Sequence, residues 1–201
     1  MVSCDPALTE KAALRSTALQ RRESISAATR AAAAEAVAAR PLPIDLAAAA
    51  AESAAVVSGF WPIRSEINPL PLLRRFAAAG ARLALPTIVQ RGQPLRFRGF
   101  AFGEELAHGQ WGIREPKPDA PELDPDVLLV PLAAFDRRGH RIGYGAGYYD
   151  LTLKALRAVK SITAIGLAFA LQELDAIPAL PHDARLDLVL TEREVIDCRG
   201  T

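Results

Sequence analysis

Cysteine is scarce in this sequence, and the two that are present, Cys4 and Cys198, lie near opposite ends of the chain. That separation matches neither a metal-binding cluster nor a disulfide framework, and it is typical of a protein from a reducing compartment. The three histidines, His108, His140 and His182, also lack metal-ligand spacing, so we expect them to be loop residues. Both thiols are expected to be structural or incidental.

The sequence also lacks an excess of charge and a long apolar segment. Its 24 basic and 23 acidic side chains nearly cancel, for a formal net charge of +1 at pH 7, so no broad electrostatic footprint for nucleic acid or an anionic membrane is visible. The N-terminus has no apolar signal core, and the alanine-rich segment 46–57 is short and interrupted by Glu52. We expect a cytoplasmic protein in which any bound anion is met by local charges.

What the sequence does contain favours a single α/β domain over residues 1–201, because half of it is apolar and strand patterns alternate with helix patterns. Strands are expected at 54–60, 82–86, 127–131, 161–170 and 186–190, and helices from Asp5 to Arg22, from Ser24 or Ser26 to Ala39, from Asn68 to Ala79 and from Gly147 to Val159. A hairpin or meander at 87–103, a loop at 108–121, a helical turn at 172–176 and an edge strand at 194–198 complete the pattern. The predicted fold is a Rossmann-like three-layer α/β sandwich with a largely parallel central sheet flanked by helices and a β-hairpin at one edge.

The most informative stretch is VLLVPLAAFDRRGHRIGYGAGYYD, residues 127–150, in which a buried strand leads into a glycine-rich loop. Gly143, Gly145 and Gly147 alternate with other residues where a helix begins, so successive backbone amides can converge on a phosphate near the helix N-terminus. The spacing is neither a Walker loop nor the Rossmann fingerprint. The alternative is a tight turn on a hairpin.

Several charged and aromatic residues accompany this loop. Asp150 follows it at a place suited to magnesium bridging phosphate oxygens. Lys11 and Arg15 share one helix face, which is either solvated or opposed by an anion. Trp61 and Glu66 lie in the loop after strand 54–60, where they are either surface groups or ligand contacts.

The segments AFDRRGHRIGYGAGYYD and WPIRSEIN resemble the signature of the 5-formyltetrahydrofolate cyclo-ligase family, and the resemblance extends over nearly the whole chain. It implies an ATP-dependent ring closure of 5-formyltetrahydrofolate to 5,10-methenyltetrahydrofolate, with release of ADP and phosphate. The γ-phosphoryl group activates the formyl oxygen, N10 attacks the formyl carbon, and phosphate leaves. Such an enzyme needs positioning and charge stabilisation more than a nucleophile, and the sequence has no Ser/His/Asp or Cys/His arrangement.

The resemblance also implies roles for individual residues. Lys11 and Arg15 match a basic pair that neutralises ATP phosphates. Trp61 and Glu66 match folate-binding positions. Asp150 and Asp183 match magnesium-associated acids, with Asp187 as a less direct alternative on the same segment. The nucleotide loop comprises Arg141, Ile142, Gly143, Tyr144, Gly145, Ala146, Gly147, Tyr148 and Tyr149, and its part from Tyr144 to Tyr148 also faces folate. No residue is assigned as nucleophile or general base.

Two features depart from the family pattern or have no assigned role. Ala146 stands where relatives often have glycine or lysine, which removes a cation that could contact phosphate. The Trp111 loop, with Arg114 and Glu115, resembles a family segment but receives no ligand contact.

The expected partners are 5-formyltetrahydrofolate and ATP, with Mg²⁺ as cofactor. We expect the protein to be a monomer that binds neither nucleic acid nor a membrane. Two other readings stay open: a non-catalytic nucleotide- or RNA-binding relative on the same fold, and another enzyme on a similar scaffold, such as a sugar-phosphate isomerase. A requirement for ATP separates the cyclo-ligase from the isomerase.

Overall fold

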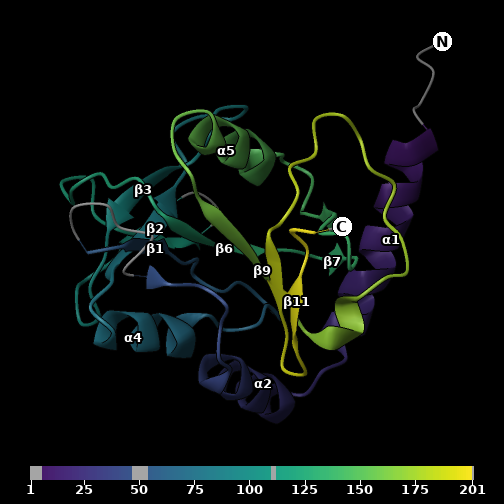
Figure 1. Ribbon diagram of the computed structural model, residues 1–201, viewed down its shortest axis with the longest axis horizontal. Helices are drawn as coiled ribbons and strands as arrows, with labels where there is room; N and C mark the ends of the chain where they lie inside the picture. Colours follow the sequence, from purple (N-terminus) through teal and green to yellow (C-terminus); the bar gives the residue numbers. More distant parts are fainter. Residues whose placement is uncertain (1–5, 47–53, 110–111, 201) are drawn as a thin grey trace.

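The computed structural model describes residues 6–46, 54–109 and 112–200, and its centre is a seven-stranded sheet (Figure 1). The strand order is β11-β10-β9-β6-β1-β2-β3. The strands are β1 (Val56–Ser58), β2 (Arg82–Thr87), β3 (Arg96–Gly99), β6 (Val127–Pro131), β9 (Thr163–Leu167), β10 (Leu188–Leu190) and β11 (Val195–Asp197).

All neighbouring pairs are parallel except the two at the edges, where β3 pairs antiparallel with β2 and β11 antiparallel with β10. This confirms the expected largely parallel sheet with a hairpin at one edge. The central strand β6 is buried from Val127 to Val130, as expected for a strand covered on both faces.

Helices cover both faces of the sheet. Helices α2 (Ala27–Ala39) and α4 (Leu70–Ala78) pack on one face and α5 (Tyr148–Arg157) on the other, while α1 (Pro6–Glu23) lies beside the sheet (Figure 1). Ser26 begins α2, because its side chain accepts a hydrogen bond from the Thr29 amide. Val37 and Leu73 are fully buried against the first face and Leu153 against the second. The three-layer α/β sandwich is therefore confirmed.

Local differences from the sequence prediction are confined to short elements. Within 108–121, expected to be a loop, Ala107–His108 (β4) pairs antiparallel with Arg114–Glu115 (β5), while Trp111 lies outside the described residues. A second small hairpin joins Ala134–Phe135 (β7) to Arg141–Ile142 (β8). The turn expected at 172–176 is a 3-10 helix, η2, at Ala170–Gln172. None of the helices in the described ranges combines the length and apolar character needed to cross a membrane.

The topology defines where a ligand binds. From β1 the chain continues to β2 on one side, whereas β6 pairs with β1 on its other side. The loops that leave the carboxyl ends of β1 and β6 therefore diverge, which is where open α/β sheets bind ligands. The Trp61–Glu66 loop leaves β1, and the β7–β8 hairpin and glycine loop follow β6.

Candidate functional site

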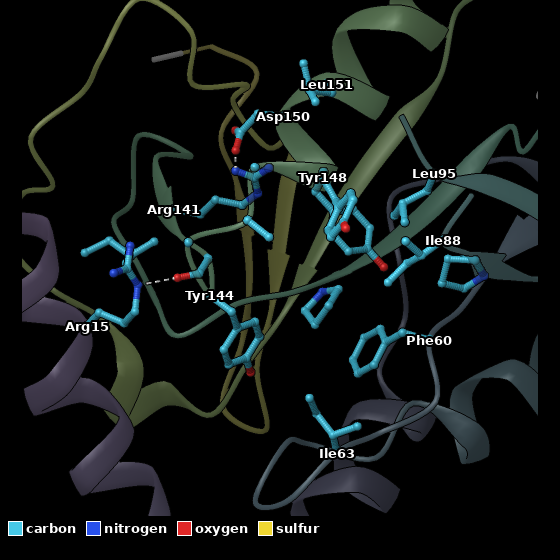
Figure 2. A pocket seen from close by; sticks show the side chains of 18 of the residues that line it. Arg15, Phe60, Ile63, Ile88, Leu95, Arg141, Tyr144, Tyr148, Asp150 and Leu151 are labelled. Carbon is cyan, nitrogen blue, oxygen red and sulfur yellow. Dashed lines mark hydrogen bonds and ion pairs between the residues drawn. The ribbon is translucent and has the colours of Figure 1, made fainter. Parts of the chain in front are cut away.

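A cavity of about 600 Å³ opens at this divergence and receives side chains from both halves of the chain (Figure 2). Apart from the alternative acid Asp187, every residue singled out from the sequence for ATP, folate or magnesium lines it: Lys11, Arg15, Trp61, Glu66, Arg141, Ile142, Gly143, Tyr144, Gly145, Ala146, Gly147, Tyr148, Tyr149, Asp150 and Asp183. Charged groups gather at one end, around Arg15, Arg141 and Asp150. Apolar groups, including Phe60 and Ile88, gather at the other (Figure 2).

The glycine loop spans the gap between β8 and the first turn of α5 and is not the turn of a hairpin. Gly145 has φ of 98° and Gly147, the N-cap residue just before α5, has φ of 71°. Both values lie in the left-handed region, where a side chain is strained. The loop thus ends on a helix N-terminus, where free amides and the helix dipole attract an anion.

Arg15 reaches this loop from α1. Its Nε donates a hydrogen bond to the Gly143 carbonyl at 2.6 Å, and its guanidinium lies 3.9 Å from where a Cβ on Gly145 would stand. Arg15 is therefore part of the loop's surroundings and not of a solvated helix face.

Lys11 lies one turn earlier on the same helix and is 6% exposed. Its ammonium forms an ion pair with Asp183, which also accepts a hydrogen bond from the Leu180 amide at 2.7 Å. Burial alone would raise the pKa of Asp183, but Lys11 and the Leu180 amide outweigh it and hold that pKa below its ordinary value. Lys11 and Arg15 thus bring two cations to the charged end of the cavity.

Asp150 sits in the first turn of α5 against a buried arginine. Its Oδ1 accepts from Arg141 Nη1 at 2.9 Å and from the Ala184 amide at 3.0 Å (Figure 2). Burial lowers the pKa of Arg141, and the Asp150 charge opposes that shift. Asp187, the less direct alternative, bonds Arg157 and the Ala164 amide and does not line the cavity.

The donor set suits magnesium better than a structural metal. Within the described ranges, no three His, Cys, Asp or Glu side chains are grouped so that they could hold a metal ion. Two carboxylates, Asp150 and Asp183, nevertheless line the charged end of one cavity. Magnesium is usually held by one or two carboxylates together with substrate phosphate oxygens, so these residues fit that ion.

At the other end, Glu66 is a buried acid among apolar and aromatic groups. It is 7% exposed, and its Oε2 accepts from the Ile63 amide at 2.9 Å. Burial raises the pKa of Glu66, while hydrogen bonding from Tyr144 and Ile63 and the charge of Arg22 oppose the rise. Tyr144 is 41% exposed as a whole residue, but burial of its hydroxyl and the nearby Glu66 charge raise the pKa of that phenol.

The structure also brings to the site residues to which the sequence analysis assigned no ligand contact. Arg22 donates to the Tyr144 hydroxyl at 2.5 Å, and Arg114 lies 5.5 Å from the centroid of the Trp61 ring. The apolar wall and rim include Leu8, Phe60, Ile63, Ile88, Leu95, Ile113, Leu151 and Leu180, with Glu115 and His182 also lining the cavity. Lys11, Arg15 and Arg22 follow one another at spacings of four and seven residues, which keep one helix face, so the sequence held a signal for Arg22.

Comparisons with known proteins agree with this architecture. The model of the 5-formyltetrahydrofolate cyclo-ligase family matches residues 7–192. A 5-formyltetrahydrofolate cyclo-ligase of Mycolicibacterium smegmatis is 35% identical over 92% of this chain and 95% of its own length. One of Escherichia coli is 33% identical over 69% of this chain and 79% of its own length.

Solved structures show the same fold. The 5,10-methenyltetrahydrofolate synthetase of Aquifex aeolicus superposes with a TM-score of 0.75 at 27% identity, over 94% of this chain and 93% of that one. A 5,10-methenyltetrahydrofolate synthetase of Mycoplasma pneumoniae shares the fold, with a TM-score of 0.67 at 21% identity, over 90% of this chain and 98% of that one.

Proposed function

Because the chain belongs to the 5-formyltetrahydrofolate cyclo-ligase family, we propose that it converts 5-formyltetrahydrofolate to 5,10-methenyltetrahydrofolate with ATP and magnesium. The observation that carries this proposal is one cavity with a glycine-rich loop and cations at one end and a buried acid in an apolar compartment at the other. These two ends match the polyphosphate of ATP and the flat pterin of the folate.

In the proposed reaction the formyl oxygen attacks the γ-phosphorus of ATP, and the bond between that phosphorus and the ADP oxygen breaks. N10 then attacks the formyl carbon, the carbon–oxygen bond breaks, inorganic phosphate leaves and N10 loses its proton. Phosphorylation makes the formyl carbon electrophilic and turns its oxygen into a leaving group. The protein's part is to align the two substrates and stabilise charge.

The charged end would hold the triphosphate. The amides of the glycine loop and the N-terminus of α5 would bind the phosphates there, and Arg15 lies beside Gly145. Arg141 stays close to Asp150, and Lys11 to Asp183, so both cations are fixed before a nucleotide arrives. Fixed cations need little reorganisation when charge develops on the transferred phosphoryl group.

Asp150 and Asp183 would hold the magnesium ion together with phosphate oxygens. Bound there, the ion would neutralise negative charge on the phosphates during transfer.

The apolar end would hold the pterin. Glu66, when ionised, is an acceptor only, and the amide-like edge of a pterin presents N–H donors. Trp61 and Tyr148 offer aromatic surface beside a flat ring, and Phe60 and Ile88 close the compartment (Figure 2). No residue is needed as a nucleophile.

An assay with purified protein tests the proposal. The chain is mixed with 5-formyltetrahydrofolate, ATP and magnesium, and the absorbance of the methenyl product is followed together with release of ADP. We expect one ADP for each product molecule, and no product when ATP is omitted or magnesium is chelated. No product in the complete mixture, or product formed without ATP consumption, would contradict the proposal.

A further inference from the structure

Arg22 is a buried arginine that lies next to the cavity without lining it. It occupies the last turn of α1 and is 3% exposed. Its Nε donates to Ser65 Oγ at 3.1 Å, and its Nη1 donates to the Tyr144 hydroxyl at 2.5 Å. No carboxylate in the described part of the chain lies within ion-pair distance of it. A buried guanidinium is costly unless it is paired, so its nearest negative group matters.

The carboxylate that interacts with the Arg22 charge is Glu66. Burial raises the pKa of Glu66, and the Tyr144 hydroxyl and the Arg22 charge oppose that rise. Ser65, the other partner of Arg22, directly precedes Glu66 in the chain. Arg22 therefore connects two loops of the site, the Trp61–Glu66 loop through Ser65 and the glycine loop through Tyr144.

A structural role at the end of α1 explains only part of this arrangement. A cation in the last turn of a helix is favoured by the helix dipole, and exposed Arg21 satisfies that preference equally well. The dipole does not account for burial of Arg22 or for its two hydroxyl partners from separate loops.

We propose that Arg22 is a positioning residue for the apolar end of the cavity, where it holds the Tyr144 hydroxyl and the Ser65–Glu66 segment in place for hydrogen bonding to a reduced pterin. The inference rests on the proposed function. The charged and titratable groups that face Glu66 are Arg22 from α1, Tyr144 from the glycine loop and Tyr149 from α5. Of these, Arg22 is the cation.

The test compares Arg22→Gln with Arg21→Gln, which removes the same charge from the exposed neighbour in the same turn. Loss of the nearby cation makes Glu66 harder to ionise. The acidic limb of kcat/KM for 5-formyltetrahydrofolate should therefore move to higher pH. At a fixed pH on that limb, KM for the folate should rise about tenfold while KM for ATP stays unchanged, because the lost interaction belongs to folate binding. Arg21→Gln should match the wild type, and Arg22→Lys, which keeps the charge, should return the limb toward the wild-type position.

A second variant and a direct titration of Glu66 test the inference even if Arg22→Gln folds poorly. Tyr144→Phe retains Arg22 but removes the hydroxyl between it and Glu66, so it should shift the acidic limb in the same direction by a smaller amount. In the free protein, ¹³C NMR of the Glu66 carboxyl should show a higher pKa in either variant than in the wild type.

The possible failures are distinguishable. If the wild type turns over but Arg22→Gln and Tyr144→Phe keep the wild-type folate KM, acidic limb and Glu66 titration, the inference is wrong and the proposed function stands. If ATP and folate KM rise together in Arg22→Gln, Arg22 acts on the whole fold and the inference is also wrong. If the wild type neither binds nor converts the folate, the proposed function fails and takes the inference with it.

Discussion

Asp150 has two neighbours that restrict its part in the site. Its Oδ1 accepts from Arg141 Nη1 at 2.9 Å and from the Ala184 amide at 3.0 Å, while its other oxygen makes no hydrogen bond to a described residue. The Arg141 side chain is only 3% exposed. The same carboxylate is thus proposed to hold magnesium and also neutralises a buried guanidinium, so its removal should affect both catalysis and stability.

Replacing Asp150 by asparagine should lower kcat by about 100-fold, the typical effect of losing a group that stabilises charge in the transition state. The magnesium concentration needed for half-maximal activity should rise, because one of two proposed carboxylate ligands is gone. The melting temperature should also fall, because the amide no longer balances Arg141. Steady-state kinetics over a magnesium series, together with calorimetry, measures all three effects.

Asp187→Asn is the matched control for that variant. Asp187 also pairs with an arginine, Arg157, at 2.9 Å and accepts from a backbone amide, but it does not line the cavity. It should lose stability while keeping kcat and the magnesium requirement of the wild type. Wild-type values for Asp150→Asn would remove Asp150 from the proposed metal site.

At the residue scale, the sequence predicted the site residues that share one motif. It did not predict the residues that reach the site only through packing of distant segments. The glycine loop and Asp150 share one short segment, so a resemblance in that segment names them together. Arg22 has no such neighbour. Its contacts to Ser65 and Tyr144 span 43 and 122 positions, and only the folded α1 brings these groups together.

The loop that joins β8 to α5 depends on its backbone conformation. Gly147, the N-cap residue just before α5, has φ of 71°, and a Cβ built there would meet nothing within 4 Å. Any effect of adding a methyl group at Gly147 therefore comes from backbone strain and not from a clash. A substitution at Gly147 therefore tests whether the backbone conformation of the loop, and not the space around it, determines phosphate binding.

Gly147→Ala should cost about 1–2 kcal/mol in the free energy of unfolding, the usual penalty of left-handed backbone for an L-residue. Because relief of the strain shifts the loop amides that are proposed to bind phosphate, KM for ATP should rise as well. Gly92→Ala is the control, since Gly92 also has positive φ, 77°, in open space but lies outside the cavity. The control should lose similar stability with an unchanged KM for ATP. Equal KM values in all three proteins would show that the loop's shape does not determine nucleotide binding.

At the scale of elements, long patterned segments were predictable and two-residue strands were not. The strand Val127–Pro131 and the helix Ala27–Ala39 carry apolar runs or caps that define them locally. Strands β4 and β5 are two residues each, too short for a period, and exist because they pair with each other. The hairpin considered as an alternative for the glycine loop does occur nearby, but it turns at Asp136–His140, where Gly139 has φ of 83°.

At the scale of the whole molecule, segments from both ends of the chain contact each other at the cavity. Lys11 and Asp183 are 172 positions apart, and Arg15 and Gly143 are 128 apart, yet each pair is in contact. The formal net charge of +1 does not indicate this arrangement, because net charge does not show where charges cluster. Lys11 lies against an acid and Arg15 against the glycine loop. A ligand that bridges these groups connects α1 to the rest of the fold, so its binding should be measurable as global stability.

MgATP should therefore raise the melting temperature of the wild type, since a ligand at 100 times its dissociation constant adds about 2.7 kcal/mol to the free energy of unfolding. Arg15→Ala should lose most of this shift at the same ATP concentration, because a charge-assisted hydrogen bond contributes about 1.5–3 kcal/mol to binding. Differential scanning calorimetry with and without MgATP measures the shift, and fitting it over an ATP series gives the affinity.

Arg21→Ala, on the same helix but exposed, serves as the control and should keep the full MgATP shift. Comparing the two arginines separates a local phosphate contact from a general effect of positive charge on α1, because both variants change the net charge equally. An undiminished shift in Arg15→Ala would mean that the Arg15 guanidinium stays on the Gly143 carbonyl when nucleotide binds. The basic pair would then serve to dock α1 on the loop, and the phosphates would depend on the loop amides and Arg141.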